Sequence, residues 1–104
     1  MLKKLLEGLI KNKFKTEGEY SGERKNGKRH GEGYLTTSDG GVYTGEFRDD
    51  KFHGQGTYIG LDGSTYVGDW KNGEQHGEGT LTDKNGKTTY SGPWLVGKPK
   101  NILN

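Results

Sequence analysis

The chain has 104 residues, of which only 26% are hydrophobic and 20 are glycine, and its formal net charge is +2. A chain of this length forms one domain with a small core. The absence of cysteine from the sequence excludes disulfides and thiol catalysis within it, and fits a reducing compartment. Residues 1–15 contain five Lys and one Glu, which leaves 11 basic and 13 acidic residues in the remainder. The remainder is nearly neutral, so attraction to polyanions is expected from the first 15 residues.

The first segment, residues 2–14, is predicted to form an amphipathic helix. Its apolar residues recur at helical spacing on one face, and lysines occupy the other positions. A segment of this length is too short to cross a membrane. We expect it either to cover the rest of the protein or to lie on an anionic lipid surface, through Leu2, Lys3, Lys4, Leu5, Leu6, Leu9, Ile10 and Lys11. Residues 1–19 are therefore interpreted as a helix with its connector.

The remaining residues, 20–104, form a repeat array. Tyrosine recurs with steps of 23, 23 and 24 residues, at Tyr20, Tyr43, Tyr66 and Tyr90. An acidic residue, an aromatic residue, a histidine and two glycines recur at fixed offsets from these tyrosines. Such a period is typical of stacked repeat proteins, in which each unit buries its apolar face against its neighbours. Pro93 and the tail after it predict that the fourth copy ends the array as a cap.

Turn chemistry predicts a hairpin in each repeat. Asn26-Gly27 and Asn72-Gly73 are typical of two-residue hairpin loops, whereas Asp49-Asp50 fits the required positive φ less well. With such loops the first hairpin pairs Tyr20 with Gly33 and Glu23 with His30. The third pairs Tyr66 with Gly79 and Asp69 with His76. Each tyrosine ring is then expected to cover a glycine, and each histidine to face a carboxylate on the opposite side of the sheet.

The loops between hairpins must keep the tyrosines on one face. Pairing Leu35 with Tyr43, and Tyr58 with Tyr66, does so with three-residue loops at 38–40 and 61–63, each ending in Gly. In the longer third repeat, a two-residue loop at Asn85-Gly86 pairs Leu81 with Tyr90. The expected fold is mainly β: a single-layer, twisted antiparallel meander of about seven strands, preceded by the amphipathic helix.

The pattern Tyr-x-Gly-Asp-Trp-x-x-Gly-x-x-His-Gly-x-Gly of residues 66–79 resembles the repeat of the MORN family. The resemblance covers residues 20 to about 97, as three full copies and one truncated copy. It departs from the pattern at Arg24 in an aromatic position, Asp50 in a turn glycine position and Pro93 in an acidic position. The resemblance implies a sheet of hairpins with one aromatic groove that binds proteins or associates with membranes.

The function expected from these features is a non-enzymatic interaction scaffold. A protein or peptide segment would bind along an aromatic groove lined by Tyr20, Tyr43, Phe47, Phe52, Tyr58, Tyr66, Trp70, Tyr90 and Trp94. The alternative is a peripheral membrane protein that binds anionic lipid through its N-terminal helix. Self-association through the helix or an edge strand stays open. The expected location is cytoplasmic, either free or at the inner face of a membrane.

No catalytic residue, cofactor or metal is expected. Equivalent histidines stand two strands apart, about 9.6 Å from the spacing of strands, which is too far for a shared zinc ion. The basic residues near the first two turns, Arg24, Lys25, Lys28, Arg29 and Lys51, are interpreted as a solvated rim, and nucleic acid is not expected as a partner.

Overall fold

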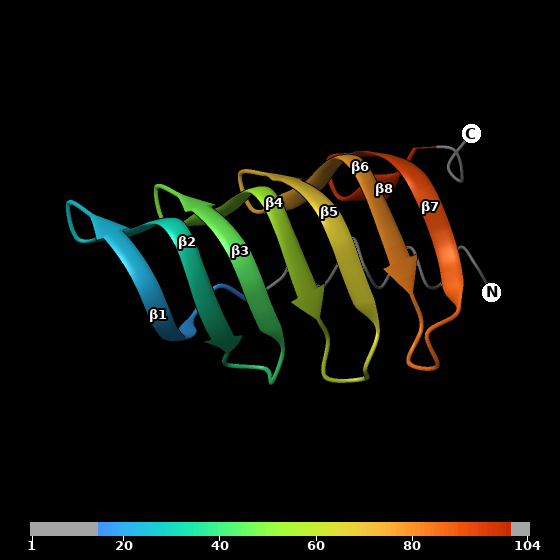
Figure 1. Cartoon of the computed structure of the whole chain (residues 1–104), viewed down its shortest axis with the longest axis horizontal. Coiled ribbons are helices and arrows are strands. Elements are labelled where there is room, and N and C mark those ends of the chain that lie inside the picture. Colours follow the sequence, from blue (N-terminus) through green and yellow to red (C-terminus); the bar gives the residue numbers. More distant parts are fainter. Residues whose placement is uncertain (1–14, 101–104) are drawn as a thin grey trace.

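The computed structural model describes residues 15–100, and all regular structure in this range is β-strand. The strands form one antiparallel sheet in which the order across the sheet is the order along the chain (Figure 1). The predicted meander is confirmed, and a two-residue strand follows the seven expected ones. The predicted helix at residues 2–14 lies outside the described residues. The strands are β1 (Gly18–Lys25), β2 (Lys28–Thr37), β3 (Val42–Arg48), β4 (Lys51–Ile59), β5 (Thr65–Lys71), β6 (Glu74–Thr82), β7 (Thr88–Leu95) and β8 (Lys98–Pro99).

The four two-residue turns of the hairpins lie at one end of the strands. We call this side of the sheet, which runs across all the hairpins, the tip edge. Asn26 and Gly27 have φ of 53° and 80°, as the asparagine-glycine signal predicts. Asp49 and Asp50 adopt the same conformation, with φ of 48° and 74°, although non-glycine residues are strained there. The fourth turn places Val96 at φ 49°. The tip edge is therefore regular in geometry even where the residues fit it poorly.

Each of the first three hairpins contains a bulge that the sequence-based pairing omitted. In the second hairpin Gly45 pairs with Gly56, but the next pair is Phe47 with Phe52, so one residue of β3 stands opposite three of β4. Gly54 lies in this bulge with φ +62°, a conformation that side chains rarely adopt. The first glycine of each His-Gly-x-Gly sequence is thus required by the bulge.

The bulge makes the predicted register within the hairpins wrong by two residues. The sequence places Tyr66 opposite Gly79, whereas Tyr66 pairs with Leu81 and Gly79 pairs with Gly68. Tyr20 shows the same shift in the first hairpin. Because the shift is even, every side chain keeps the face that was predicted for it.

The loops between hairpins lie at the other end of the strands. The predicted three-residue loops at 38–40 and 61–63 are confirmed. Thr37 and Gly41 close the first loop, and Gly40 within it has φ +90°. The third loop differs from its prediction. Asp83 and Lys87 close another three-residue loop, and the extra residue of this repeat is taken up by an irregularity next to Thr82.

A row of glycines crosses the sheet and lets the tyrosine rings lie flat on the backbone. A Cβ atom added to Gly56 would lie 2.5 Å from Cζ of Tyr43, and the Tyr43 hydroxyl donates to the Glu46 carbonyl at 2.7 Å. Each ring therefore covers a diagonal neighbour instead of its direct partner. The row consists of Gly22, Gly33, Gly45, Gly56, Gly68, Gly79 and Gly92.

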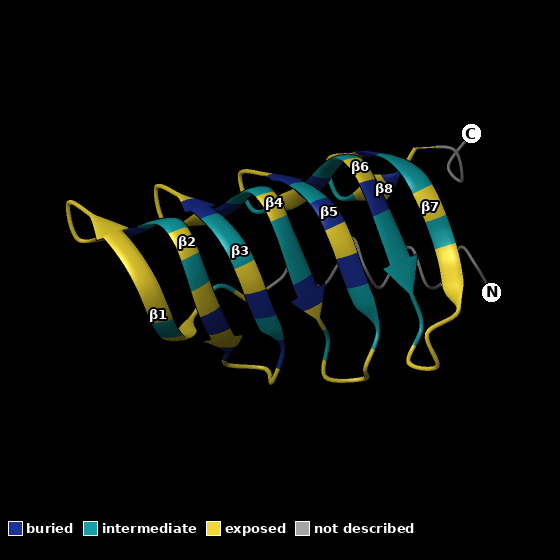
Figure 2. Cartoon of the chain, in the orientation of Figure 1, coloured by how far each residue is buried: buried dark blue, intermediate teal, exposed yellow. Residues whose placement is uncertain are grey.

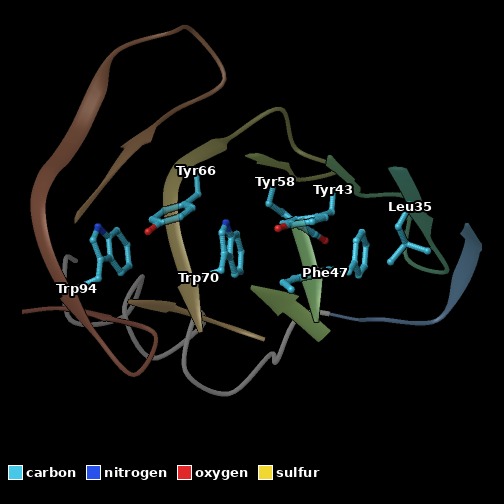
Figure 3. Packing of buried hydrophobic residues seen from close by; sticks show 8 residues of the cluster. Leu35, Tyr43, Phe47, Tyr58, Tyr66, Trp70 and Trp94 are labelled. Atoms are coloured by element: carbon cyan, nitrogen blue, oxygen red, sulfur yellow. The ribbon is translucent and has the colours of Figure 1, made fainter. Parts of the chain in front are cut away.

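The core lies on one face of this single sheet. Alternate residues of the strands are buried, and the buried positions concentrate on the central strands, whereas β1 is mostly exposed (Figure 2). The buried apolar side chains lie in a row on the inner side of the bent ribbon (Figure 3). We call this inner side the aromatic trough; its buried residues are Leu35, Tyr43, Phe47, Phe52, Tyr58, Tyr66, Trp70 and Trp94.

Candidate functional site

The aromatic trough is built from rings that meet edge to face across neighbouring hairpins. Tyr43 lies 5.1 Å from Phe47 and 5.4 Å from Trp70, between ring centroids. Tyr66 lies 5.0 Å from Trp70 and 5.0 Å from Trp94. The interplanar angles of these four contacts are 80° to 87°, the arrangement that the ring quadrupoles favour. The repeats are thus joined by one continuous series of rings, which Tyr20 and Tyr90 extend at its ends.

The polar atoms of these rings form hydrogen bonds with backbone carbonyls of the same chain. The Tyr66 hydroxyl donates to the Asp69 carbonyl at 2.8 Å, and Trp94 Nε1 donates to the Gly79 carbonyl at 3.1 Å. Burial raises the pKa of Tyr66 above its usual value, which keeps the phenol protonated and able to donate. A ligand in the trough would therefore meet the faces and edges of rings, not free hydrogen-bond donors.

The structure brings the nine predicted groove residues together on one face. Seven of them are buried, with exposed fractions of 0% to 8%, and Tyr20 and Tyr90 are partly buried. Leu81 is likewise partly buried beside the rings at the C-terminal end. The sequence prediction omitted Leu35 from the groove, although Leu35 occupies the same repeat position as Tyr58 and could have been found from it.

A buried arginine joins the first two hairpin tips. Arg29 is 8% exposed; its Nε donates to Asp50 Oδ1 at 2.6 Å, and its Nη1 and Nη2 donate to backbone carbonyls of Thr16 and Asp50. Its guanidinium lies 5.3 Å from the centroid of the Phe47 ring. Glycine would fit the positive φ of Asp50 better, but replacing Asp50 would remove this ion pair.

The Arg29–Asp50 pair predicts a pH-dependent stability. Burial raises the pKa of Asp50, but the hydrogen bonds and charge of Arg29 outweigh this effect and hold the pKa below its usual value. The carboxylate therefore stabilises the fold above its unfolded pKa of about 4, and this contribution is lost as pH falls through the lower folded pKa. The Asp50→Asn variant should be less stable at pH 7 by about 1 kcal/mol, since Asp50 is half exposed.

Thermal melts of both proteins between pH 2 and 7 check this prediction. The difference between wild type and Asp50→Asn should disappear at the acid end of the range. An equal difference at pH 2 and pH 7 would show that the charge of Asp50 is not responsible.

The histidines form no ion pair with the carboxylates that were predicted to face them. The carboxylates instead accept hydrogen bonds from the bulge backbone: Glu46 accepts from the N–H of Gln55 at 2.8 Å, and Glu23 and Asp69 make the same contact in their hairpins. The bulge, which shifts the register, is the physical reason. Within residues 15–100 there is no histidine ion pair and no cluster of three or more metal-binding side chains. The histidines concerned are His30, His53 and His76.

The fold and the trough define a single-sheet array of β-hairpin repeats joined by aromatic rings. The model of the MORN repeat matches residues 20–42, 43–65 and 66–88, and the chain belongs to the MORN-repeat family. Repeats of this family are non-catalytic modules that mediate interactions with proteins or membranes. A comparison with curated proteins finds no match to the chain. No helix in the described part of the chain is long and apolar enough to span a bilayer.

Proposed function

We propose that this protein is a scaffold module that binds a segment of a protein partner along the aromatic trough, at its C-terminal end. The observation that carries the proposal is the continuous series of rings on one face of a single-layer sheet, with Tyr90 and Leu81 only partly buried at that end. Tyr66, Trp70 and Trp94 belong to the buried cluster against which these two side chains pack.

The other end of the trough is less suited to a partner. Arg24 and Arg29 lie 5.0 Å and 5.8 Å from the centroid of the Tyr20 ring, and Arg24 stands where the later repeats have an aromatic residue. Charged side chains at an exposed edge oppose pairing with another strand. The C-terminal end has rings in both positions, Tyr90 and Trp94, 5.5 Å apart. Because the polar ring atoms are already bonded, we expect an apolar partner segment whose affinity comes from contact with the rings.

Peptide selection against the intact chain tests this proposal. A displayed random-peptide library yields binders, and the best is titrated while the fluorescence of Trp70 and Trp94, the only two tryptophans, is recorded. Binding should be saturable and should weaken about 10-fold or more in Tyr90→Ser, because an aromatic anchor is lost.

Tyr34→Ser is the matched control. Tyr34 lies next to Leu35, so it faces the other side of the sheet, where it is 49% exposed. The control should change the affinity less than about 2-fold. Peptides that bind Tyr90→Ser normally but lose affinity for Tyr34→Ser would place the site on the opposite face and overturn the proposal. Thermal melts confirm that both variants fold.

A further inference from the structure

Basic side chains surround a hollow at the tip edge, on the face opposite the trough. The hollow has a volume of about 560 Å³ and is lined by Lys28, Arg48, Lys51 and Lys71 from the first three hairpins. Arg48, Lys51 and Lys71 each adjoin a buried residue of the trough, and Lys28 adjoins the buried Arg29, so these four side chains point to the other face. We call this feature the basic hollow.

The remaining lining is polar. His53, Asn72 and Asp49 complete it, so with His53 neutral the four cations and one carboxylate leave a formal charge of +3. The hollow is half open to solvent, and its volume is sufficient for a small molecule. The basic hollow is thus large enough for a small anion and carries a net charge that attracts one.

None of the four cations of the hollow forms an ion pair within the described chain. The only salt bridge among residues 15–100 joins Arg29 to Asp50, so none of the four has a carboxylate oxygen within 4.0 Å. Arg48 pairs directly with Lys51 across its turn, and Lys28 pairs with Lys25. Like charges that face each other across a hairpin destabilise it. The first two tips each carry one such pair, whereas Lys71 in the third tip faces Glu74.

The carboxylates that recur in the first three hairpins are already hydrogen-bonded elsewhere. Glu23, Glu46 and Asp69 each accept a backbone N–H in the bulge of their own hairpin, at 2.6, 2.8 and 2.9 Å. Asp50 is held by Arg29. An anion from solution is therefore the partner that would balance the charge of the hollow.

We propose that the basic hollow is a binding site for an anion with two or more clustered phosphates. Phosphate oxygens accept several charge-assisted hydrogen bonds at once, which matches cations that converge from three hairpins. The lining has no Phe, Tyr or Trp ring for stacking of a nucleobase and no apolar pocket for a peptide anchor. These features favour a compact polyphosphate over nucleic acid or an acidic peptide. The proposal is independent of the peptide site in the trough.

Calorimetric titration of the intact chain with sodium tripolyphosphate at pH 7 and 150 mM NaCl tests the proposal. We expect saturable binding of one anion per chain. Replacing two of the four cations, in Arg48→Gln/Lys51→Gln, should weaken it about 10-fold or more, because charge-assisted hydrogen bonds are lost. These side chains are exposed at the turn, so the variant should fold, and a thermal melt checks this.

The control is Lys84→Gln/Lys87→Gln, which removes the same charge at the opposite edge of the sheet. It should change the affinity less than about 2-fold, since screening limits distant charges at this salt concentration. Absence of saturable tripolyphosphate binding, or equal weakening in the two double variants, overturns the proposal.

A second arm identifies the source of the phosphates. The fourth tip, on the same edge, exposes Leu95 and Val96, which are 51% and 55% exposed. Vesicles with 5% of a phosphoinositide bisphosphate are titrated with wild type, with Arg48→Gln/Lys51→Gln and with Leu95→Gln/Val96→Asn. If the phosphates belong to a lipid headgroup, both variants should lose vesicle binding, and only the first should lose tripolyphosphate binding. Tripolyphosphate binding without vesicle binding supports the site and assigns it to a soluble ligand.

Discussion

Replacing Gly56 by alanine should lower the free energy of unfolding by about 3 kcal/mol, as expected for overpacking that the surroundings do not relieve. The added Cβ would lie 2.5 Å from Cζ and 2.6 Å from Cε1 of Tyr43. Tyr43 has little room to move: its ring stacks on Phe52 at 3.9 Å between centroids, and its hydroxyl is bonded to the Glu46 carbonyl. The ring must therefore leave its position or the strand must shift.

Gly27→Ala separates this packing effect from the general cost of replacing glycine. Gly27 has φ +80°, and an added Cβ there meets nothing within 4 Å. Its replacement should cost only the strain of the left-handed conformation, about 1 to 2 kcal/mol. Urea unfolding of both variants measures the two costs. If Gly27→Ala proves the more destabilising, the close approach of Tyr43 to the glycine row does not control stability.

Local turn chemistry explains why much of the fold could be predicted from the sequence. Asn26-Gly27 specifies its turn because both residues tolerate positive φ, and Gly40 does the same at the other edge. The loop lengths then determine the pairing between hairpins, and Leu35 pairs with Tyr43 as expected. These signals act within a few residues, so they do not depend on the rest of the structure.

The register inside the hairpins could not be obtained from the same reasoning. Strand alternation requires only that the tyrosines stay on one face. A register shifted by two residues meets this requirement as well as the correct register does. The bulge is accompanied by a contact across the hairpin, in which Glu46 accepts a hydrogen bond from the backbone N–H of Gln55 while Gly54 takes positive φ. Neither effect follows from strand alternation.

The third repeat was ambiguous for a related reason. A two-residue loop and a three-residue loop followed by an irregularity both place Leu81 opposite Tyr90. The structure adopts the second, in which Asp83 accepts hydrogen bonds from the backbone N–H groups of Asn85 and Lys87 at 2.9 and 3.0 Å. The aspartate therefore favours the loop type used by the other repeats, which loop length alone does not distinguish.

The face on which the aromatic residues lie could be predicted from the sequence, but the extent of their burial could not. The repeat columns place Tyr43, Tyr66 and Trp70 on one face, and the structure agrees. Their burial depends on the bend of the strands at the glycine row and on contacts between neighbouring hairpins, which the periodicity of one strand does not contain. The same is true of Arg29, which occupies the repeat position of Phe52 and is buried beside the rings.

Trp70 is the residue whose loss should most affect cooperation between the two halves of the array. Its ring lies 5.4 Å from Tyr43 and 5.2 Å from Phe52 in the second hairpin, and 5.0 Å from Tyr66 on its own strand. Its Nε1 also donates to the Gly56 carbonyl of the preceding hairpin at 3.1 Å. Trp70→Ala should therefore lower the free energy of unfolding by about 4 kcal/mol.

The stability of a repeat array is a sum of unit terms and nearest-neighbour interface terms, so weakening one central interface should also make unfolding less cooperative. In Trp70→Ala the fluorescence of Trp94, which reports the C-terminal half, should change at a different urea concentration from the far-ultraviolet circular dichroism.

Trp70→Phe keeps a ring but loses the indole N–H, so it should lower the free energy of unfolding by about 1 to 2 kcal/mol, and its unfolding should stay cooperative. Val67→Ala, an exposed position on the same strand, should change stability by less than about 0.5 kcal/mol. Coincident transitions in Trp70→Ala would show that the hairpins are coupled through the backbone ladder and not through the rings.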